Sequence, residues 1–258
     1  FQREAKTWAR FKHPYILPFY GFAVLEEIRF FLVSPWANMG NCMKYLEDNP
    51  GVSRHKLVMQ IAEALDYLHS GQAGMAYVHG DLKGDNVLIS DHGNAMLCDF
   101  GLTRCAEKIA SMTQTPSQIH GFGHVRFSAP EILLTSSRPT TQSDVFAFGC
   151  LVIQIFSGRQ PYSDLETDIQ VIIYVTGKRK PGRPKGQDGV EAQLDDDLWS
   201  LLDQCLDHEP ASRPTIGEVA KRLKGPSNPP KGEMVTISTL KPMCIANVRR
   251  RDRSSLEA

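Results

Sequence analysis

Hydrophobic residues recur along this chain at two spacings, which separate a short opening part from a longer helical part. Ala5, Trp8 and Phe11 fall on one side at helical spacing, which predicts a short amphipathic helix. The segments 16–24 and 28–33 are rich in β-branched and aromatic residues and are separated by two glutamates, which predicts two antiparallel strands. A small sheet is therefore expected directly after the opening helix.

The longer part of the chain is predicted to be mainly helical. The segment 54–69 carries a stripe of leucine and isoleucine, and 197–206 is also amphipathic. The segment 143–157 is apolar nearly all round, which is typical of a buried helix. The segments 87–89 and 95–98 flank an Asp-His-Gly-Asn turn, which predicts a hairpin of two buried strands.

Composition refines this picture mainly by exclusion. The 258 residues contain 29 Lys and Arg against 29 Asp and Glu, so the net charge of zero gives no general attraction to nucleic acid or an anionic membrane. Six cysteines without CxxC spacing indicate neither a zinc site nor a disulfide framework and favour a reducing compartment. The longest apolar run, 145–156, is shorter than the about 20 residues of a membrane helix. We therefore expect a cytoplasmic protein with no membrane segment and no nucleic-acid partner.

The strongest chemical signal is a run of polar residues around the predicted hairpin. The run HGDLKGDN at 79–86 precedes the first strand, and DFG at 99–101 follows the second. Further along come APE at 129–131 and Arg-Pro at 213–214. In order and spacing, these motifs resemble the catalytic loop, the metal-binding DFG and the end of the activation segment of protein kinases. The resemblance covers roughly residues 1–223.

The resemblance implies a fold and an activity. The implied fold is α+β and protein-kinase-like, with two lobes, most of the N-terminal β-sheet lobe missing and a mainly helical C-lobe. The expected parts are an N-lobe remnant at 1–35, a C-lobe at 36–224 and a disordered tail at 225–258, where prolines and arginines gather. The implied activity is transfer of the γ-phosphate of ATP, with Mg²⁺, to a protein substrate.

The motif residues supply the groups that phosphoryl transfer needs. By resemblance, Asp81 would accept the proton of the substrate hydroxyl, and Lys83 would steady the transferred phosphoryl group. Asn86 and Asp99 would hold two Mg²⁺ ions against ATP. An isolated loop aspartate is more often a capping or solvated group, but this ordered set is hard to explain without phosphoryl transfer.

The resemblance also assigns the opening part of the chain to the ATP site. Glu4 would be the helix glutamate that pairs with the ATP-gripping lysine. Ser34 would be a small gatekeeper at the back of the adenine pocket, and Trp36 and Ala37 would belong to the hinge that meets the adenine edge. Taken alone, Glu4 reads more plainly as a solvated glutamate at a helix start.

Three structural roles follow from the same resemblance. Asp144 would accept backbone hydrogen bonds from the region 79–80. Glu131 and Arg213 would form a buried ion pair. A stack of internal side chains would link the two lobes: Trp8, Phe19, His79 and Phe100.

Smaller features bear on specificity and regulation. Asp-Leu-Lys at 81–83 resembles Ser/Thr kinases, and the context around 13–19 resembles the tyrosine-kinase-like (TKL) group, within which tyrosine activity stays open. Gly80 stands where many kinases have an Arg that pairs with an activation-segment phosphate, which disfavours that form of control. His124 stands where the family usually has Thr or Ser, so unusual substrate docking is expected.

A larger departure lies at the start of the sequence. No GxGxxG and no strand lysine precede Glu4, and Lys6, on the same helix, cannot reach across from an opposite strand. We therefore expect an N-terminally truncated kinase domain that is weakly active or inactive, since each ~1.4 kcal/mol of lost transition-state stabilisation is tenfold in rate. One alternative is a pseudokinase or scaffold. A more distant alternative is a small-molecule phosphotransferase, against which the APE motif at 129–131 argues.

Overall fold

The computed structural model of this protein describes residues 2–25, 29–71, 75–105, 125–135, 137–184 and 194–225. These residues belong to one unit of the chain, Phe1–Pro226. The tail expected at 225–258 lies outside the described residues, Gly225 excepted, and so does His124.

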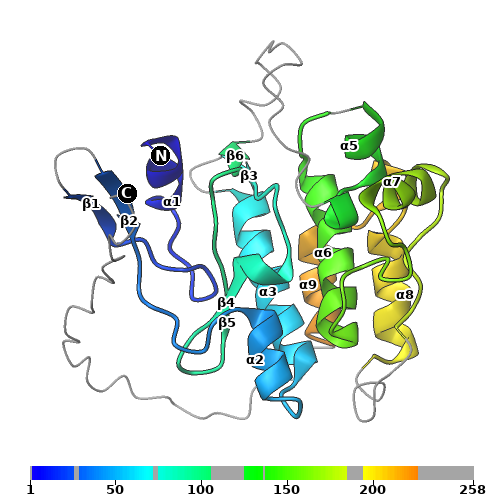
Figure 1. The fold of residues 1–258 in the computed structure, drawn as a ribbon, viewed down its shortest axis with the longest axis horizontal. Coiled ribbons are helices and arrows are strands. Elements are labelled where there is room, and N and C mark those ends of the chain that lie inside the picture. Colours follow the sequence, from blue (N-terminus) through cyan, green and yellow to red (C-terminus); the bar gives the residue numbers. More distant parts are fainter. Residues whose placement is uncertain are drawn as a thin grey trace, which may run out of the picture. The chain divides into compact units, whose positions relative to one another are not determined.

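A short helix and a two-stranded sheet form the opening part (Figure 1). Helix α1 spans Gln2–Trp8, and β1 (Gly21–Leu25) pairs antiparallel with β2 (Arg29–Val33). The predicted helix and strand pair are confirmed, but β1 begins five residues later than the segment 16–24. The reason is that Leu17 donates its amide to the Leu97 carbonyl oxygen instead, at 2.9 Å, and the following Pro18 has no amide to donate.

Helices dominate the described residues that follow. Their bounds, with those of the short strands, are α2 (Cys42–Asp48), α3 (Arg54–Ser70), β3 (Tyr77–Val78), β4 (Val87–Ile89), β5 (Ala95–Leu97), β6 (Arg104–Cys105), α5 (Pro130–Thr135), α6 (Thr141–Ser157), α7 (Asp168–Thr176), α8 (Asp196–Cys205) and α9 (Ile216–Leu223). The three predicted helices are confirmed to within two residues at each end, as α3, α6 and α8. Single turns of 3₁₀-helix lie at Gly84–Asn86, Val125–Phe127 and Pro210–Ser212.

The predicted hairpin is confirmed as the antiparallel pair β4 and β5, in which Val87 faces Leu97 and Ile89 faces Ala95. Helix α2 was missed, because the stretch before it reads as a linker. Asn41 caps this helix, since its Oδ1 accepts a hydrogen bond from the Lys44 amide at 2.9 Å. An asparagine can mark a helix start as well as a turn.

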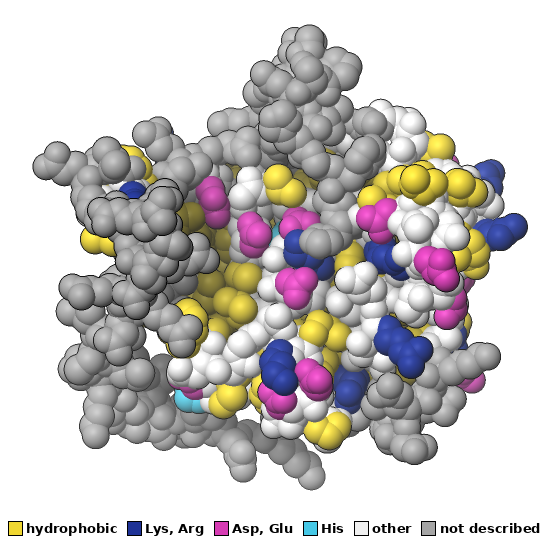
Figure 2. Space-filling model, viewed as in Figure 1, with side chains coloured by type: hydrophobic (Ala, Val, Ile, Leu, Met, Phe, Trp, Pro, Cys, Tyr) yellow, Lys and Arg dark blue, Asp and Glu magenta, His cyan; other side chains and the backbone are white. Residues whose placement is uncertain are grey.

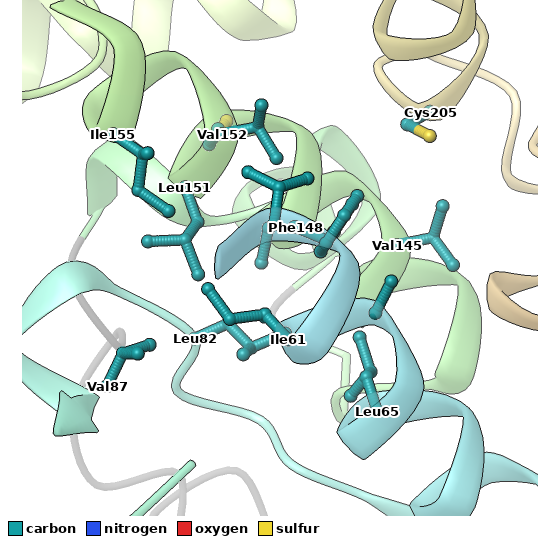
Figure 3. Packing of buried hydrophobic residues seen from close by; sticks show 14 of the residues in the cluster. Ile61, Leu65, Leu82, Val87, Val145, Phe148, Leu151, Val152, Ile155 and Cys205 are labelled. Atoms are coloured by element: carbon teal, nitrogen blue, oxygen red, sulfur yellow. The ribbon is translucent and has the colours of Figure 1, made fainter. Parts of the chain in front are cut away.

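Helix α6 lies at the centre of the core and contacts α3 on one side and α8 on another (Figure 1). Figure 3 shows Ile61 and Leu65 of α3 close to Phe148 and Leu151 of α6. All four side chains are at most 1% exposed. Burial of each such side chain contributes about 1.5–3 kcal/mol to folding. Because apolar neighbours surround α6, its sequence is apolar nearly all round.

Asp144 and Gln154 are buried polar side chains of this mostly apolar helix. Asp144 is 1% exposed and Gln154 is 8% exposed. A buried polar group needs hydrogen-bond partners, so both are expected to be committed to specific contacts. Both accept hydrogen bonds from backbone amides of the loop between β3 and β4. Among the described residues, no helix has both the length and the apolar character required to cross a bilayer.

Candidate active site

Asp81, Lys83 and Asn86 lie together in the loop 79–86, between β3 and β4. Asn86 Nδ2 donates hydrogen bonds to Asp81 Oδ2 and to the Asp81 carbonyl oxygen, both at 2.8 Å. Lys83 Nζ lies 3.1 Å from Asp81 Oδ2. The Lys83 and Asp81 side chains are 14% and 12% exposed, so water screens this ion pair only weakly. Asp81 Oδ2 therefore contacts both the Lys83 ammonium group and the Asn86 side-chain amide.

Asp99 is held next to this loop through the backbone. The Cys98 amide donates to the Asn86 carbonyl oxygen at 3.0 Å, and Asp99 follows directly. Asp99 has φ 62°, a left-handed conformation that Asp adopts more readily than most residues, and its carboxylate accepts the Gly101 amide at 3.3 Å. The Asp99 side chain is exposed. The structure therefore brings together the four residues of the predicted catalytic set.

Glu4 reaches the same region from α1. A Cβ atom built on Gly101 would lie 3.3 Å from Asp99 Oδ1 and 3.7 Å from Glu4 Oε2. Both carboxylates therefore approach one point on the backbone of the DFG motif. The Glu4 side chain thus lies beside the DFG motif, and its pairing with an ATP-gripping lysine stays a prediction.

The predicted stack of internal side chains is confirmed. Ring centroids lie 5.1 Å apart for Trp8 and Phe19, 5.7 Å for Trp8 and Phe100, and 5.6 Å for Phe100 and His79. Trp8 Nε1 also donates to the Leu17 carbonyl oxygen at 2.6 Å. The stack joins α1 to the DFG motif and to the start of the loop 79–86.

Asp144 holds the start of the loop 79–86, as predicted. Its Oδ2 accepts the His79 amide at 2.8 Å, and its Oδ1 accepts the Gly80 amide at 2.9 Å. Sequence reasoning missed a third contact, in which His69 Nε2 lies 2.9 Å from Asp144 Oδ2 across 75 residues. Gly80 has φ 82°, so its backbone conformation itself favours glycine over arginine.

His79 joins the loop to the strand that leads to the DFG motif. Burial lowers the pKa of the His79 imidazole, so the ring is neutral near pH 7. Nε2–H donates to the Cys98 carbonyl oxygen at 3.2 Å, and Nδ1 accepts the Asp81 amide at 3.3 Å. A neutral ring with its proton on Nε2 satisfies both contacts. His79 thus connects Asp81 with Cys98, which directly precedes Asp99.

The residues predicted to form the gatekeeper and hinge lie on the segment that leads from β2 to α2. Ser34 Oγ donates to the Pro35 carbonyl oxygen at 3.4 Å, the Ala37 carbonyl oxygen accepts the Gly40 amide at 3.1 Å, and Trp36 is 74% exposed. In the part of the chain that the structure describes, Ser34, Trp36 and Ala37 form no hydrogen bond with the predicted catalytic set. The Gly40 carbonyl oxygen accepts the amide of Ile89 in β4 at 2.9 Å, which ties this segment to the hairpin.

The donor atoms of Asn86 and Asp99 fit a Mg²⁺ ion. Because Asn86 Nδ2 donates to Asp81, Asn86 Oδ1 is left as an acceptor, and Asp99 adds a carboxylate. Oxygen ligands of this kind are the ones that Mg²⁺ prefers. Figure 2 shows acidic and basic side chains gathered beside a hollow lined by hydrophobic side chains. Such a hollow beside charged groups suits a ligand with an apolar base and a charged end.

The loop 79–86 and the DFG motif beside it have the arrangement that is typical of phosphoryl-transfer domains. A model of the family described as protein tyrosine and serine/threonine kinase matches residues 1–223. The chain therefore belongs to the protein kinase family.

The relatives within this family include proteins named as serine/threonine kinases and proteins named as tyrosine kinases. The chain is 24% identical over 229 residues to a probable serine/threonine-protein kinase of Dictyostelium discoideum, covering 86% of this chain and 13% of the relative. It is 28% identical over 234 residues to serine/threonine-protein kinase 12 of Arabidopsis thaliana, covering 87% and 47%. It is 29% identical over 222 residues to the tyrosine-protein kinase Src64B of Drosophila melanogaster, covering 84% and 37%. The chain thus spans less than half the length of each of these relatives.

Proposed function

We propose that this chain carries the catalytic part of a protein kinase that transfers the γ-phosphate of ATP to Ser and Thr hydroxyls of protein substrates. The observation that carries the proposal is the Asp81 carboxylate, which Asn86 Nδ2 and Lys83 Nζ both contact within 3.1 Å. A carboxylate fixed in this way is preorganised to orient a hydroxyl and to accept its proton.

The remaining residues take the roles that their placement supports. Lys83, next to Asp81, would steady the transferred phosphoryl group. Asn86 and Asp99 would hold Mg²⁺, which neutralises charge on the phosphate oxygens when it is bound. Glu4 would pair with an ATP-binding lysine. The segment that includes Ser34, Trp36 and Ala37 would contact the adenine.

The preference for Ser and Thr rests on the Asp-Leu-Lys order at 81–83, and membership in the TKL group rests on the context around 13–19. These two assignments are more specific than membership in the protein kinase family, because the relatives include tyrosine kinases as well as Ser/Thr kinases. Phosphoamino-acid analysis of the product tests the preference directly. Phosphotyrosine as the main product would contradict it.

We also propose that further strands complete the ATP site in the intact kinase domain. Phe22 is 63% exposed, Phe30 55% and Phe31 46%. The strand register puts Phe22 and Phe30 on one face of the β1–β2 pair and Phe31 on the other. A two-stranded sheet with aromatic side chains exposed on both faces is marginally stable alone, which supports pairing with further strands. Residues 1–35 would then be part of a larger N-lobe, and 36–224 would be the C-lobe.

The exposed β1–β2 sheet also favours a second candidate function, a pseudokinase or scaffold. Exposed hydrophobic patches commonly mark sites of protein association. In that case the exposed sheet would bind a partner protein. The two candidates differ in whether the protein transfers phosphate.

Phosphate transfer by wild type and Asp81→Asn tests the proposal, with Asp91→Asn as the control. Asp91 is an exposed turn residue whose Oδ1 accepts Asn38 Nδ2 away from Asp81. Both this chain and any longer form that its transcript encodes are assayed with Mg²⁺, ATP and casein. We expect the longer form to be the more active, Asp81→Asn to lower its rate by at least about 100-fold, and Asp91→Asn to lower it less than about twofold. Equal rates for wild type and Asp81→Asn would sink the kinase proposal and leave the scaffold.

A further inference from the structure

The loop 79–86 has a second attachment to helix α6 besides Asp144. Gln154 Oε1 accepts a hydrogen bond from the amide of Gly84 at 3.0 Å, and this contact is buried. Asp144 and Gln154 are ten residues apart on the same helix, which is about 15 Å along its axis. The loop is therefore held at its start and near its end by two side chains of one rigid element.

Packing leaves Gly84 little freedom to leave this position. A Cβ atom at Gly84 would lie 2.5 Å from Met43 Cγ and 2.9 Å from Gln154 Oε1. The backbone at Gly84 is thus enclosed between α2 and α6. The absence of a side chain lets the Gly84 amide approach Gln154 closely enough for a hydrogen bond.

Gly84 is also the first residue of the 3₁₀ turn that shapes the end of the loop. The Asn86 amide donates to the Lys83 carbonyl oxygen at 3.0 Å, and the Val87 amide donates to the Gly84 carbonyl oxygen. The nitrogen that Gln154 binds belongs to the same peptide group as that Lys83 carbonyl. Fixing this peptide therefore fixes the turn that carries Lys83 on one side and Asn86 on the other.

We propose that Gln154 is a positioning residue, which acts through the Gly84 peptide to hold Lys83 and Asn86 against Asp81. The inference rests on the proposed kinase function and deepens it by adding a group that no kinase motif in this sequence contains. Gln154 touches none of the three side chains through a hydrogen bond among the described residues. Its effect is on the geometry of the turn and not on substrate contact.

The chemistry of the amide suits this task. The Gly84 N–H is buried, so without an acceptor it would be left unpaired, and the turn would move to find water or another partner. Methionine has nearly the length of glutamine but no such acceptor, whereas glutamic acid keeps an acceptor at the same distance along the side chain. Gln154→Met should therefore release the turn, and Gln154→Glu should hold it.

The chain offers a matched control for the loss of a buried amide. Gln60 is 2% exposed, and its Oε1 accepts the Ala95 amide at 2.9 Å, which is the same kind of bond as that between Gln154 and Gly84. Ala95 lies at the start of β5, away from the turn. Gln60 Nε2 also donates to Asn94 Oδ1 at 2.9 Å, so Gln60→Met should lower stability at least as much as Gln154→Met does, without loosening the turn.

Amide hydrogen exchange at Gly84, measured by NMR in the wild type and in the three variants, tests the inference. We expect exchange about tenfold faster in Gln154→Met, and close to wild type in Gln154→Glu and Gln60→Met. In the form of the chain that transfers phosphate, we expect kcat about tenfold lower in Gln154→Met with KM for ATP and casein within about twofold, and recovery in Gln154→Glu.

Two results would overturn the inference: Gly84 exchange unchanged in Gln154→Met, or kcat lowered equally by Gln60→Met. If the wild type transferred phosphate no faster than Asp81→Asn, only the kinase proposal would be refuted. The exchange rates would still decide whether Gln154 positions the loop, because they require no catalysis.

Discussion

Arg213 and Glu131, 82 residues apart in the sequence, form a bidentate ion pair in which both N–O distances are 2.7 Å. The Arg213 side chain is 0% exposed, whereas that of Glu131 is 21% exposed. The guanidinium also lies over the ring of Phe146 in α6, 5.1 Å from its centroid. The pair confirms the one expected from the sequence and ties the APE motif to the segment before α9.

Removing one partner of this pair should be much worse than removing both. Glu131→Ala leaves the buried Arg213 charge without its carboxylate, so we expect a loss of ~3–5 kcal/mol in the free energy of unfolding. The double variant Glu131→Leu with Arg213→Met should recover part of that loss, because no buried charge remains. The recovery is partial because the carbonyl oxygens of Asp207 and Gln142 lose the hydrogen bonds that Arg213 donates at 2.7 and 2.9 Å. Urea denaturation measures both. An equal loss in the single and double variants would contradict this account.

A surface ion pair provides the comparison for that experiment. Lys44 Nζ lies 2.9 Å from Asp48 Oδ1, but the two side chains are 59% and 56% exposed. Exposed pairs of this kind contribute about 0–1 kcal/mol. Lys44→Ala should therefore change the free energy of unfolding far less than Glu131→Ala does.

Two of the three tryptophans, Trp8 and Trp36, should differ sharply in their effect on stability. Trp8 is 6% exposed, stacks on Phe19 and Phe100 and donates to the Leu17 carbonyl oxygen. Trp8→Leu should therefore lower the free energy of unfolding by ~2–4 kcal/mol, through lost ring contacts and an unpaired carbonyl. Trp36→Leu, at a side chain that is 74% exposed, should change it by less than about 0.5 kcal/mol. Thermal unfolding followed by circular dichroism compares them, and similar losses would argue against a central role for the stack.

Local pattern in the sequence was sufficient for the elements whose structure depends on near neighbours. The apolar run that became α6 and the strands around the turn at 91–94 fall where periodicity put them. The start of β1 was placed too early, because Leu17 bonds to Leu97 and this partner is 80 residues away. A local pattern of strand-forming residues cannot tell which strand they will meet.

The residues of the candidate site also divide into those that local motifs predict and those that depend on partners far away in the sequence. Motif resemblance brought together Asp81, Lys83, Asn86 and Asp99, because these residues lie close in sequence around one hairpin. The contacts of Gln154 with Gly84 and of His69 with Asp144 span 70 and 75 residues. Neither has a local signature, although a glutamine in an otherwise apolar helix is itself a signal of a buried hydrogen bond.

Cys98 should react slowly with thiol reagents, although it directly precedes Asp99. Burial raises the pKa of the Cys98 thiol to about 12, and the neighbouring Asp99 carboxylate adds to this effect. Only about 1 thiol in 10,000 is then ionised at pH 8, and the thiolate is the reactive form. We expect iodoacetamide at pH 8 to modify Cys98 about 1,000-fold more slowly in the folded protein than in urea. Mass spectrometry measures the rates, and comparable rates would show that the Cys98 thiol is accessible in the folded protein.

The same pKa shift predicts a loss of stability at high pH. The folded thiol holds its proton up to about pH 12, whereas an unshifted thiol loses it near 9.0. Between these values the unfolded chain binds fewer protons, so the free energy of unfolding falls as pH rises. Cys98→Ala should therefore show a shallower fall than wild type between pH 9 and pH 11. Parallel curves from urea denaturation at each pH would contradict the shift.

Tyr162 carries a buried hydroxyl that forms no hydrogen bond within the described residues. Tyr162 is 8% exposed, and its ring packs edge-on against the ring of Tyr174, with ring centroids 5.8 Å apart. Removing an unpaired buried hydroxyl relieves a desolvation penalty while the ring contacts remain. We therefore expect Tyr162→Phe to raise the free energy of unfolding by up to about 1 kcal/mol.

Tyr67 supplies the opposite case for the same substitution. Its hydroxyl oxygen accepts the Lys12 amide at 2.9 Å, so Tyr67→Phe should lower the free energy of unfolding by about 0.5–1.5 kcal/mol. Urea denaturation of the two variants under identical conditions gives changes of opposite sign if hydrogen bonding decides the outcome. A loss of stability in Tyr162→Phe as large as that in Tyr67→Phe would mean that the Tyr162 hydroxyl binds a partner, such as a buried water molecule, inside the folded protein.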